Sequence, residues 1–223
     1  MSKNKKKTLP YEDRCRLVLI IPTTPDASNL TSDALSGGDV ASIIIPMGAM
    51  ELGEYQDHVE RITLVAQEKD VAVIIESDSQ VMGRSGADGM FIPSGLEALK
   101  DAVARFSPKR LVGYGGIKTR HQTMEAAEFN PDFLFFGKVD GDIRPEAHPK
   151  NMKLGSWCAQ VMRISAIVMG GSKLESVVEV AQSGAEFVAL SLGVFSFPEG
   201  AGAAVAKANE LLDAHAPKFS DDE

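Results

Sequence analysis

The chain has 223 residues, of which 44% are hydrophobic and 24% are charged, and its formal net charge at pH 7 is −8. These fractions are typical of a soluble globular protein. The sequence has no run of about 18 apolar residues, the length that a membrane-spanning helix needs, so we expect no membrane partner. The negative charge argues against a nucleic-acid partner, because such binders need a basic face that displaces counterions from phosphates.

The first 15 residues, MSKNKKKTLPYEDRC, are basic but contain no apolar segment with a cleavage site, so we expect no secretory signal. We therefore predict a cytoplasmic location, with Cys15 and Cys158 as reduced structural thiols. No change of composition marks a linker. A single domain over residues 16–215 is expected, between flexible tails formed by residues 1–15 and 216–223.

Eight short apolar runs are predicted to be β-strands. Most of them are continuously apolar and do not alternate with polar residues, which is typical of strands buried on both faces of a parallel sheet. The runs cover residues 16–22, 41–47, 71–76, 89–93, 110–116, 133–138, 165–171 and 187–193.

Each of these runs is followed by a stretch with the apolar spacing of a helix. The predicted helices cover residues 29–36, 54–69, 79–85, 95–106, 119–129, 149–162, 173–183 and 199–215. Eight strands that alternate with eight helices predict an α/β protein made of one (β/α)8 TIM barrel.

The predicted helix over residues 173–183 has signals at both ends. Ser172 is a predicted N-cap, Glu175 follows three residues later as in a capping box, and Gly184 ends the helix. We therefore expect this helix to begin directly after the two glycines that close the seventh strand.

Loops at the carboxyl ends of the strands form the active site in such barrels, and the loops after strands seven and eight often bind phosphate. Here those loops contain Gly170 and Gly171, then Ser191, Leu192 and Gly193. Because glycine has no Cβ, its backbone N–H groups can approach phosphate oxygens closely, next to the positive end of a helix dipole. These five residues are the predicted phosphate site; a tight turn that needs positive φ is the alternative.

The segment GKVDGDIRPEAHPK after strand six is the least regular part of the chain and is predicted to be a functional loop. Lys138, Asp142 and His148 are its catalytic candidates. A charged residue directly at a strand end is seldom needed for packing, although a solvated lysine at the rim is the alternative for Lys138. Asp140 and Asp142 are candidate metal ligands, or they form an Asx turn around Gly141.

Two carboxylates flank a turn at the end of strand three. Glu76 and Asp78 offer the hard oxygen ligands that suit Mg²⁺, which usually keeps several waters and takes one or two protein ligands. They are the predicted metal ligands; a helix N-cap made by Ser77 or Asp78 is the alternative.

The segments SGADGMFI, LVGYGG and NPDFLFFGK, followed by MGGSKLESVVEVAQSGAEFVALSLGVF, resemble the thiamine phosphate synthase family in order and spacing, over about residues 16–195. The resemblance implies a transferase of thiamine biosynthesis, which couples a hydroxymethylpyrimidine diphosphate to a thiazole phosphate and releases diphosphate. It also implies Mg²⁺ as the cofactor, and it places the thiazole phosphate on Gly170, Gly171, Ser191 and Leu192.

The other half of the family's site has changed. A Gln-x-Arg-x-x-Lys element that holds the diphosphate is replaced by IIIPMGAME, an Asn-Asp pair by Glu76 and Ser77, and a Ser after strand five by Gly115. Two alternatives therefore stay open: a related phosphate-binding barrel, such as a thiazole tautomerase-like enzyme or a sugar-phosphate isomerase, and a catalytically silent regulator that binds a phosphorylated ligand. Oligomeric state is also open, since barrels of this kind often pair through helix faces into homo-oligomers.

Overall fold

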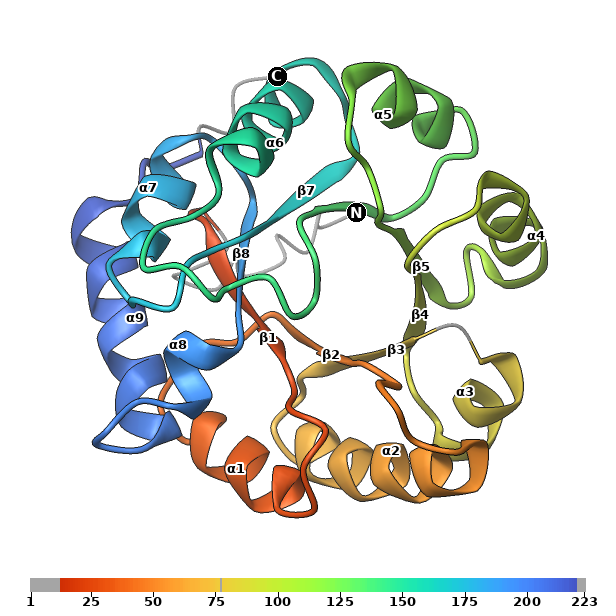
Figure 1. The fold of residues 1–223 in the computed structure, drawn as a ribbon, viewed down its shortest axis with the longest axis horizontal. Helices are drawn as coiled ribbons and strands as arrows, with labels where there is room; N and C mark the ends of the chain where they lie inside the picture. The colour runs from red at the N-terminus through yellow and green to blue at the C-terminus, as the bar shows by residue number, and fades with distance from the viewer. Residues whose placement is uncertain (1–12, 77, 220–223) are drawn as a thin grey trace, which may run out of the picture.

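The computed structural model describes residues 13–76 and 78–219. Eight parallel strands follow one another in chain order around a closed barrel, in which β8 pairs with β1 (Figure 1). The TIM barrel predicted from the sequence is confirmed. The strands are β1 (Arg16–Ile20), β2 (Ser42–Ile45), β3 (Ala72–Glu76), β4 (Gly89–Ile92), β5 (Leu111–Tyr114), β6 (Phe133–Phe136), β7 (Ser165–Met169) and β8 (Phe187–Leu190).

The helices form a ring outside the barrel, as Figure 1 shows. In chain order they are α1 (Ala27–Ala34), α2 (Leu52–Gln67), α3 (Ser79–Ser85), α4 (Leu96–Phe106), α5 (Arg120–Ala127), α6 (Pro149–Val161), α7 (Ser176–Gln182), α8 (Leu192–Phe195) and α9 (Ala201–His215). Each predicted helix is present. Among the described residues, no helix has the length and apolar character that a membrane crossing requires.

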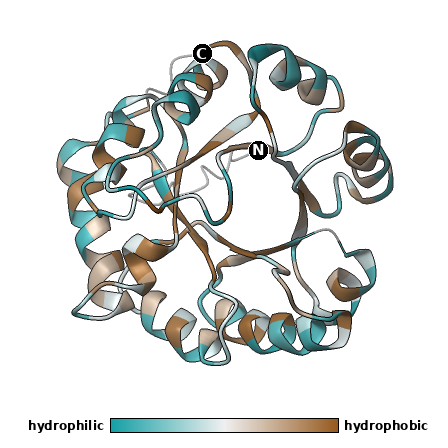
Figure 2. Ribbon diagram, in the orientation of Figure 1, coloured by the Kyte–Doolittle hydropathy of each residue, from teal (hydrophilic) through white to brown (hydrophobic). Residues whose placement is uncertain are grey.

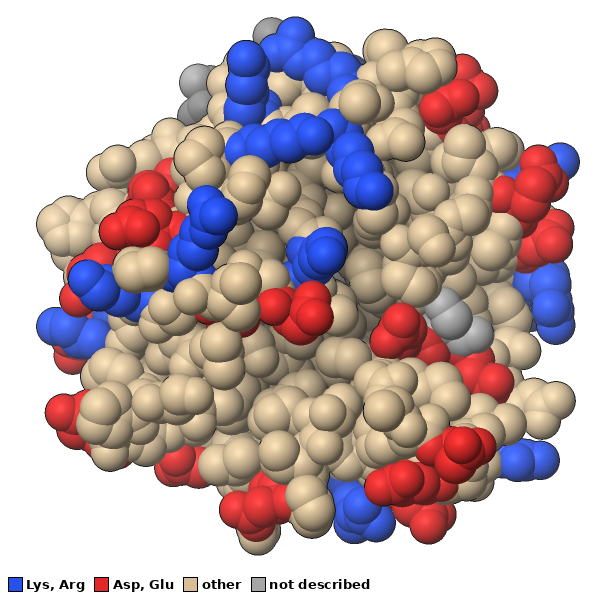
Figure 3. Space-filling view, in the orientation of Figure 1, with Lys and Arg blue, Asp and Glu red and all other residues tan. Residues whose placement is uncertain are grey.

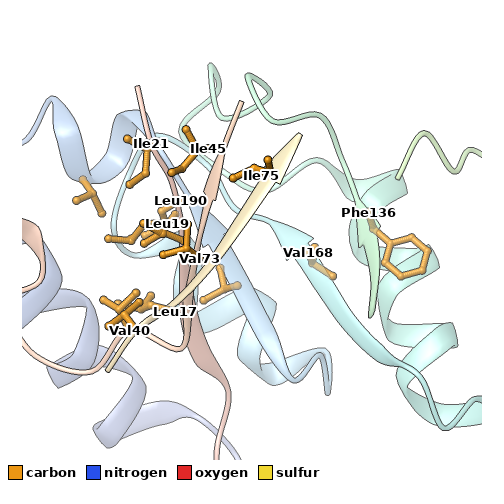
Figure 4. Packing of buried hydrophobic residues seen from close by; sticks show 14 of the residues in the cluster. Leu17, Leu19, Ile21, Val40, Ile45, Val73, Ile75, Phe136, Val168 and Leu190 are labelled. Carbon is orange, nitrogen blue, oxygen red and sulfur yellow. The ribbon is translucent and has the colours of Figure 1, made fainter. Parts of the chain in front are cut away.

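The apolar runs are continuous because both faces of every strand are buried. Inward-facing residues form a cluster inside the barrel that includes Ile20, Phe91 and Phe135. Alternate residues face outward and pack under the helices. Figure 4 shows part of this outer layer, in which Leu19 of β1 lies beside its register partner Leu190 of β8. In Figure 2 the strands are mainly hydrophobic, and the helices are mixed, with polar residues toward the outside.

Two local predictions near the end of the barrel were wrong. The eighth strand ends at Leu190, and Leu192–Phe195 forms the short helix α8. Ser172 does not begin α7, which starts at Ser176 after a turn over residues 172–175. The capping box fails because the Ser172 N–H donates to the carbonyl of Arg144, 2.7 Å away, in the loop after β6. Gly184 does end the helix, with φ of +88°.

The two ends of the described chain lie together. The N–H of Phe219 donates to the carbonyl of Asp13, and Lys218 forms an ion pair with the Asp13 carboxylate at 2.8 Å. The buried Arg14 donates to Asp213 of α9. The ordered structure therefore extends beyond residues 16–215 at both ends, and the remaining predicted tails, residues 1–12 and 220–223, lie outside the described residues.

Both cysteines are free and fully buried. Burial raises the pKa of the Cys15 and Cys158 thiols to about 12, so both stay protonated at neutral pH. Their predicted structural role is confirmed.

Candidate functional site

A cavity of about 560 Å³ opens at the carboxyl ends of β1, β2, β3 and β8. This is the end of a TIM barrel at which active sites lie. The connection from β6 to α6 forms one of its walls. The cavity is lined by Ile20, Ile21, Pro22, Thr23, Pro46, Gly48, Glu76, Val139, Asp140, Asp142, Ile143, Ser191 and Leu192.

The lining combines apolar strand ends with negative charge. Glu76, Asp140 and Asp142 are its charged residues, and the described residues that line it include no Lys or Arg. Figure 3 shows that Lys and Arg side chains gather on this face near α6, whereas Asp and Glu predominate over α2 and α3. A diphosphate would therefore meet like charge in the cavity unless a cation accompanied it.

Glu76 is positioned at the end of β3 by two neighbours. Its Oε2 accepts the N–H of Met47 at 2.9 Å, so the carboxylate is held toward the loop after β2. Its backbone N–H donates to the hydroxyl of Tyr55 at 2.9 Å, and this hydroxyl donates to the carbonyl of Ile45 at 2.7 Å. Burial raises the pKa of Tyr55 well above its usual range, so the phenol stays protonated and can bridge the ends of β2 and β3.

Asp78, the second predicted metal ligand, is the N-cap of α3. Its Oδ1 accepts the N–H groups of Gln80 and Val81, both at 2.8 Å. The alternative stated from the sequence, an N-cap made by Ser77 or Asp78, is therefore confirmed for Asp78; Ser77 lies outside the described residues. Asp78 does not line the cavity that Glu76 faces.

The three catalytic candidates lie on the loop after β6 in different surroundings. Lys138 is exposed two residues beyond the end of β6, which stops at Phe136 and not at the predicted residue 138. His148 is exposed at the far end of the loop, where its Nδ1 accepts the N–H of Lys150 at 3.2 Å and caps α6. Asp142, in contrast, is only 1% exposed. A catalytic role for each of them stays a prediction.

The structure brings the five residues of the predicted phosphate site together. A Cβ on Gly193 would lie 3.3 Å from the carbonyl oxygen of Gly171, so the loops after β7 and β8 are in contact. Gly170 keeps a strand bond, because its N–H donates to Ala189 at 2.9 Å. The N–H of Ser191 donates to Oδ2 of Asp142, also at 2.9 Å. The N–H of Gly171 donates to the hydroxyl of Ser176 at 2.9 Å, and that of Gly193 also donates to Oδ2 of Asp142. These backbone donors therefore already have partners within the chain, and phosphate binding by these loops stays a prediction.

Sequence reasoning missed Tyr55 and the partner of Asp142. Tyr55 shares the apolar face of α2 with Val59 and Ile62, and a phenol on such a face was the one signal that pointed to a buried hydrogen-bond bridge. No local pattern links Asp142 to Ser191, which is 49 residues away.

Comparison with known proteins places the chain among enzymes of one kind. The sequence model of a family described as thiamine monophosphate synthase matches residues 17–194. The chain is 28% identical to the thiamine-phosphate synthase of Hyphomonas neptunium over 211 residues, which cover 90% of this chain and 95% of that protein. It is also 28% identical to the thiamine-phosphate synthase of Rhodospirillum centenum over 203 residues, or 89% and 98% of the two chains.

Among solved structures, the fold is similar to that of a thiamine phosphate pyrophosphorylase from Pyrococcus furiosus. The TM-score is 0.74 and the sequence identity is 16%, with 91% of this chain and 98% of that chain covered. A 3-hexulose-6-phosphate synthase gives a TM-score of 0.67 at 18% identity, over 90% of this chain and all of that one. At these identities the structures support the barrel fold alone.

Proposed function

Because the chain belongs to the thiamine monophosphate synthase family, a transferase family of thiamine biosynthesis, we propose that it joins a hydroxymethylpyrimidine diphosphate to a thiazole phosphate at the mouth of its barrel. The match over residues 17–194, which runs from β1 into α8, is the observation that carries this proposal. The C–O bond to the diphosphate breaks and its electron pair leaves with the diphosphate. The thiazole nitrogen then forms the new bond to the pyrimidine methylene carbon.

The family implies Mg²⁺, and Glu76 fits such a cofactor. Its carboxylate lines the cavity, and the bond from Met47 uses Oε2 and leaves Oε1 free of that bond. Mg²⁺ is commonly held by one or two carboxylates together with substrate phosphates and water. When bound, the ion would stabilise the charge that develops on the departing diphosphate. Asp78 fits less well, since its Oδ1 is used by the N-cap of α3.

Positioning is the main contribution that we assign to the protein itself. Apolar strand ends, including Ile20 and Ile21, form the floor of the cavity and exclude water from the reacting carbon. The backbone N–H groups of Ser191 and Gly193 are the donors that we assign to the thiazole phosphate, since that of Gly171 donates to the hydroxyl of Ser176 at 2.9 Å. Lys138, exposed at the end of β6, is the proposed cation for the other phosphate group. Holding both reactants in line lowers the entropic part of the barrier.

The proposal is tested by incubating the purified chain with both substrates and Mg²⁺ and by measuring thiamine phosphate and diphosphate. We expect both products, and at least a tenfold lower kcat/KM for Glu76→Gln, which keeps the bond from Met47 but loses the charge. Glu68→Gln, at an exposed site at the end of α2, is the matched control and should stay within about twofold of the wild type.

Thiamine phosphate binding without turnover would contradict the synthase reaction. It would favour the regulator that the sequence left open. The cytoplasmic location and pairing into homo-oligomers stay predictions.

A further inference from the structure

The carboxylate of Asp142 occupies the backbone donors that follow β8. Its Oδ2 accepts the N–H of Ser191 at 2.9 Å and the N–H of Gly193 at 3.4 Å. Two convergent backbone N–H groups on one oxygen are the arrangement that phosphate oxygens adopt in such loops. The side chain is 99% buried, so the contact is part of the packed structure.

The same segment also covers the donors that follow β7. The N–H of Ser172 donates to the backbone carbonyl of Arg144 at 2.7 Å, and the N–H of Lys173 donates to the backbone carbonyl of Pro145 at 3.2 Å. A Cβ on Gly171 would overlap the carbonyl of Pro145, so the two backbones are in direct contact. In Figure 1 the connection from β6 to α6 runs across the ends of β7 and β8 before it turns back to α6. We refer to residues 139–147 as the strap.

The strap is preceded by a glycine and anchored at its far end. At its start, Gly137 has φ of +145°, in a region that glycine enters freely. At its end, the N–H of Ala147 is held by the Glu179 carboxylate of α7 at 2.6 Å. Displacement of residues 140–146 would break the bonds that Asp142, Arg144 and Pro145 accept, while Ala147 stays anchored to α7.

Asp142 is not a fully satisfied anchor. Its second oxygen, Oδ1, is buried and has no hydrogen-bond partner among the described residues. A buried carboxylate oxygen without a donor raises the free energy of the closed arrangement. The Asp142 carboxylate thus holds the strap in place through Oδ2, which accepts both backbone N–H groups, while Oδ1 accepts no hydrogen bond from the described residues.

We propose that Asp142 is an internal competitor for the phosphoryl group of the ligand, so that the strap in its present position inhibits phosphate binding. This inference rests on the proposed function, because it takes the loops after β7 and β8 as the phosphate site. A phosphate and the Asp142 carboxylate cannot share the N–H groups of Ser191 and Gly193. The apparent affinity for a phosphorylated ligand is then reduced by the fraction of molecules in which the strap is closed.

The first test measures phosphate affinity in Mg²⁺-free buffer by titration calorimetry, with inorganic phosphate and thiamine phosphate as probes. Asp142→Ala removes the competitor, and we expect the affinity for both probes to rise at least tenfold, while the affinity for unphosphorylated thiamine stays within twofold. Asp140→Ala is the matched control: it removes a charge from the same cavity but frees no backbone donor, so the gain should be below threefold. Unchanged or weaker phosphate affinity in a folded Asp142→Ala protein would overturn the proposal.

The second test uses the wild-type chain and does not depend on any variant. Hydrogen exchange should show that saturating thiamine phosphate increases exchange in the strap and protects the amides of Ser191 and Gly193. Unchanged or stronger protection of the strap would overturn the proposal. Tighter phosphate binding by Asp142→Ala, together with no product formation by the wild-type chain, would support the strap and refute the synthase. Product formation by the wild-type chain, with no gain in the phosphate affinity of Asp142→Ala, would support the synthase and refute the strap.

Discussion

Gly113 leaves the space inside the barrel that an aromatic ring fills. A Cβ at Gly113 on β5 would overlap the ring of Phe133, and one at Gly115, directly after the strand, would lie 2.5 Å from the ring of Phe91. Phe91 and Phe133 stack with their ring centroids 6.5 Å apart. The absence of a side chain at Gly115 therefore serves the packing of the barrel interior.

We expect Gly113→Ala to lower the free energy of unfolding by about 1–3 kcal/mol, because the added methyl group overpacks the barrel interior. Gly83→Ala is the matched control, since a Cβ there meets no atom within 4 Å and the residue lies within α3. The control should raise stability by roughly 0.5–1 kcal/mol through helix propensity. Urea unfolding measures the free energy of unfolding of both variants. Equal changes in the two would contradict overpacking at Gly113.

At the scale of elements, α2 does more than cover the barrel. Its apolar face carries Tyr55, whose hydroxyl connects the end of β2 to the end of β3. The carboxylate of Glu76 faces the cavity at the same point. Tyr55 therefore fixes the two strand ends that position this carboxylate.

For Tyr55→Phe we predict a loss of about 1–3 kcal/mol in the free energy of unfolding, because the carbonyl of Ile45 and the N–H of Glu76 lose a buried partner. Leu64→Ala, at a position on α2 that is 68% exposed, should change stability by less than about 0.5 kcal/mol. The measurement is chemical denaturation at constant pH. A loss no larger than that of the control would mean that water replaces the phenol.

At the scale of the whole molecule, one type of hydrogen bond between a carboxylate and a strand backbone recurs around the closed sheet. The acidic residue just before β4, β6 and β8 accepts the N–H of a residue on the preceding strand. Asp88 accepts from Val73 at 2.8 Å, Asp132 from Val112 at 2.7 Å, and Glu186 from Ala166 at 2.8 Å. The three sites belong to the segments SGADGMFI, NPDFLFF and SGAEFVAL, which carried the family resemblance.

Glu186 makes the stability of the barrel depend on pH. Burial raises its pKa from the usual 4.5, against the smaller opposing effect of the Ala166 bond. The folded state then binds more protons than the unfolded state, so stability falls as the pH rises from about 4.5 through the folded pKa. We expect Glu186→Gln, which keeps an acceptor for Ala166, to remove this fall. Parallel stability curves of the wild type and the variant would show that Glu186 titrates normally.

Local patterns in the sequence were sufficient to predict the barrel, its eight strands and the ends of most helices. Strands buried on both faces need continuous apolar runs, and a glycine such as Gly184 ends a helix by its own backbone freedom. The same reasoning selected Glu76 and the loops after β7 and β8, because a parallel barrel brings all carboxyl strand ends to one face.

Which group accepts the backbone N–H bonds of those loops depends on the tertiary structure. The sequence indicated a metal ligand or a turn residue at Asp142. Its carboxylate instead accepts the N–H of Ser191, 49 positions later, because the strap crosses two strands. Likewise, Ser172 had the sequence of an N-cap, but its N–H pairs with Arg144 and α7 begins later. Hydrophobic periodicity reports which face of an element is buried. The path of an irregular loop is set by contacts distant in sequence, and no local pattern encodes them.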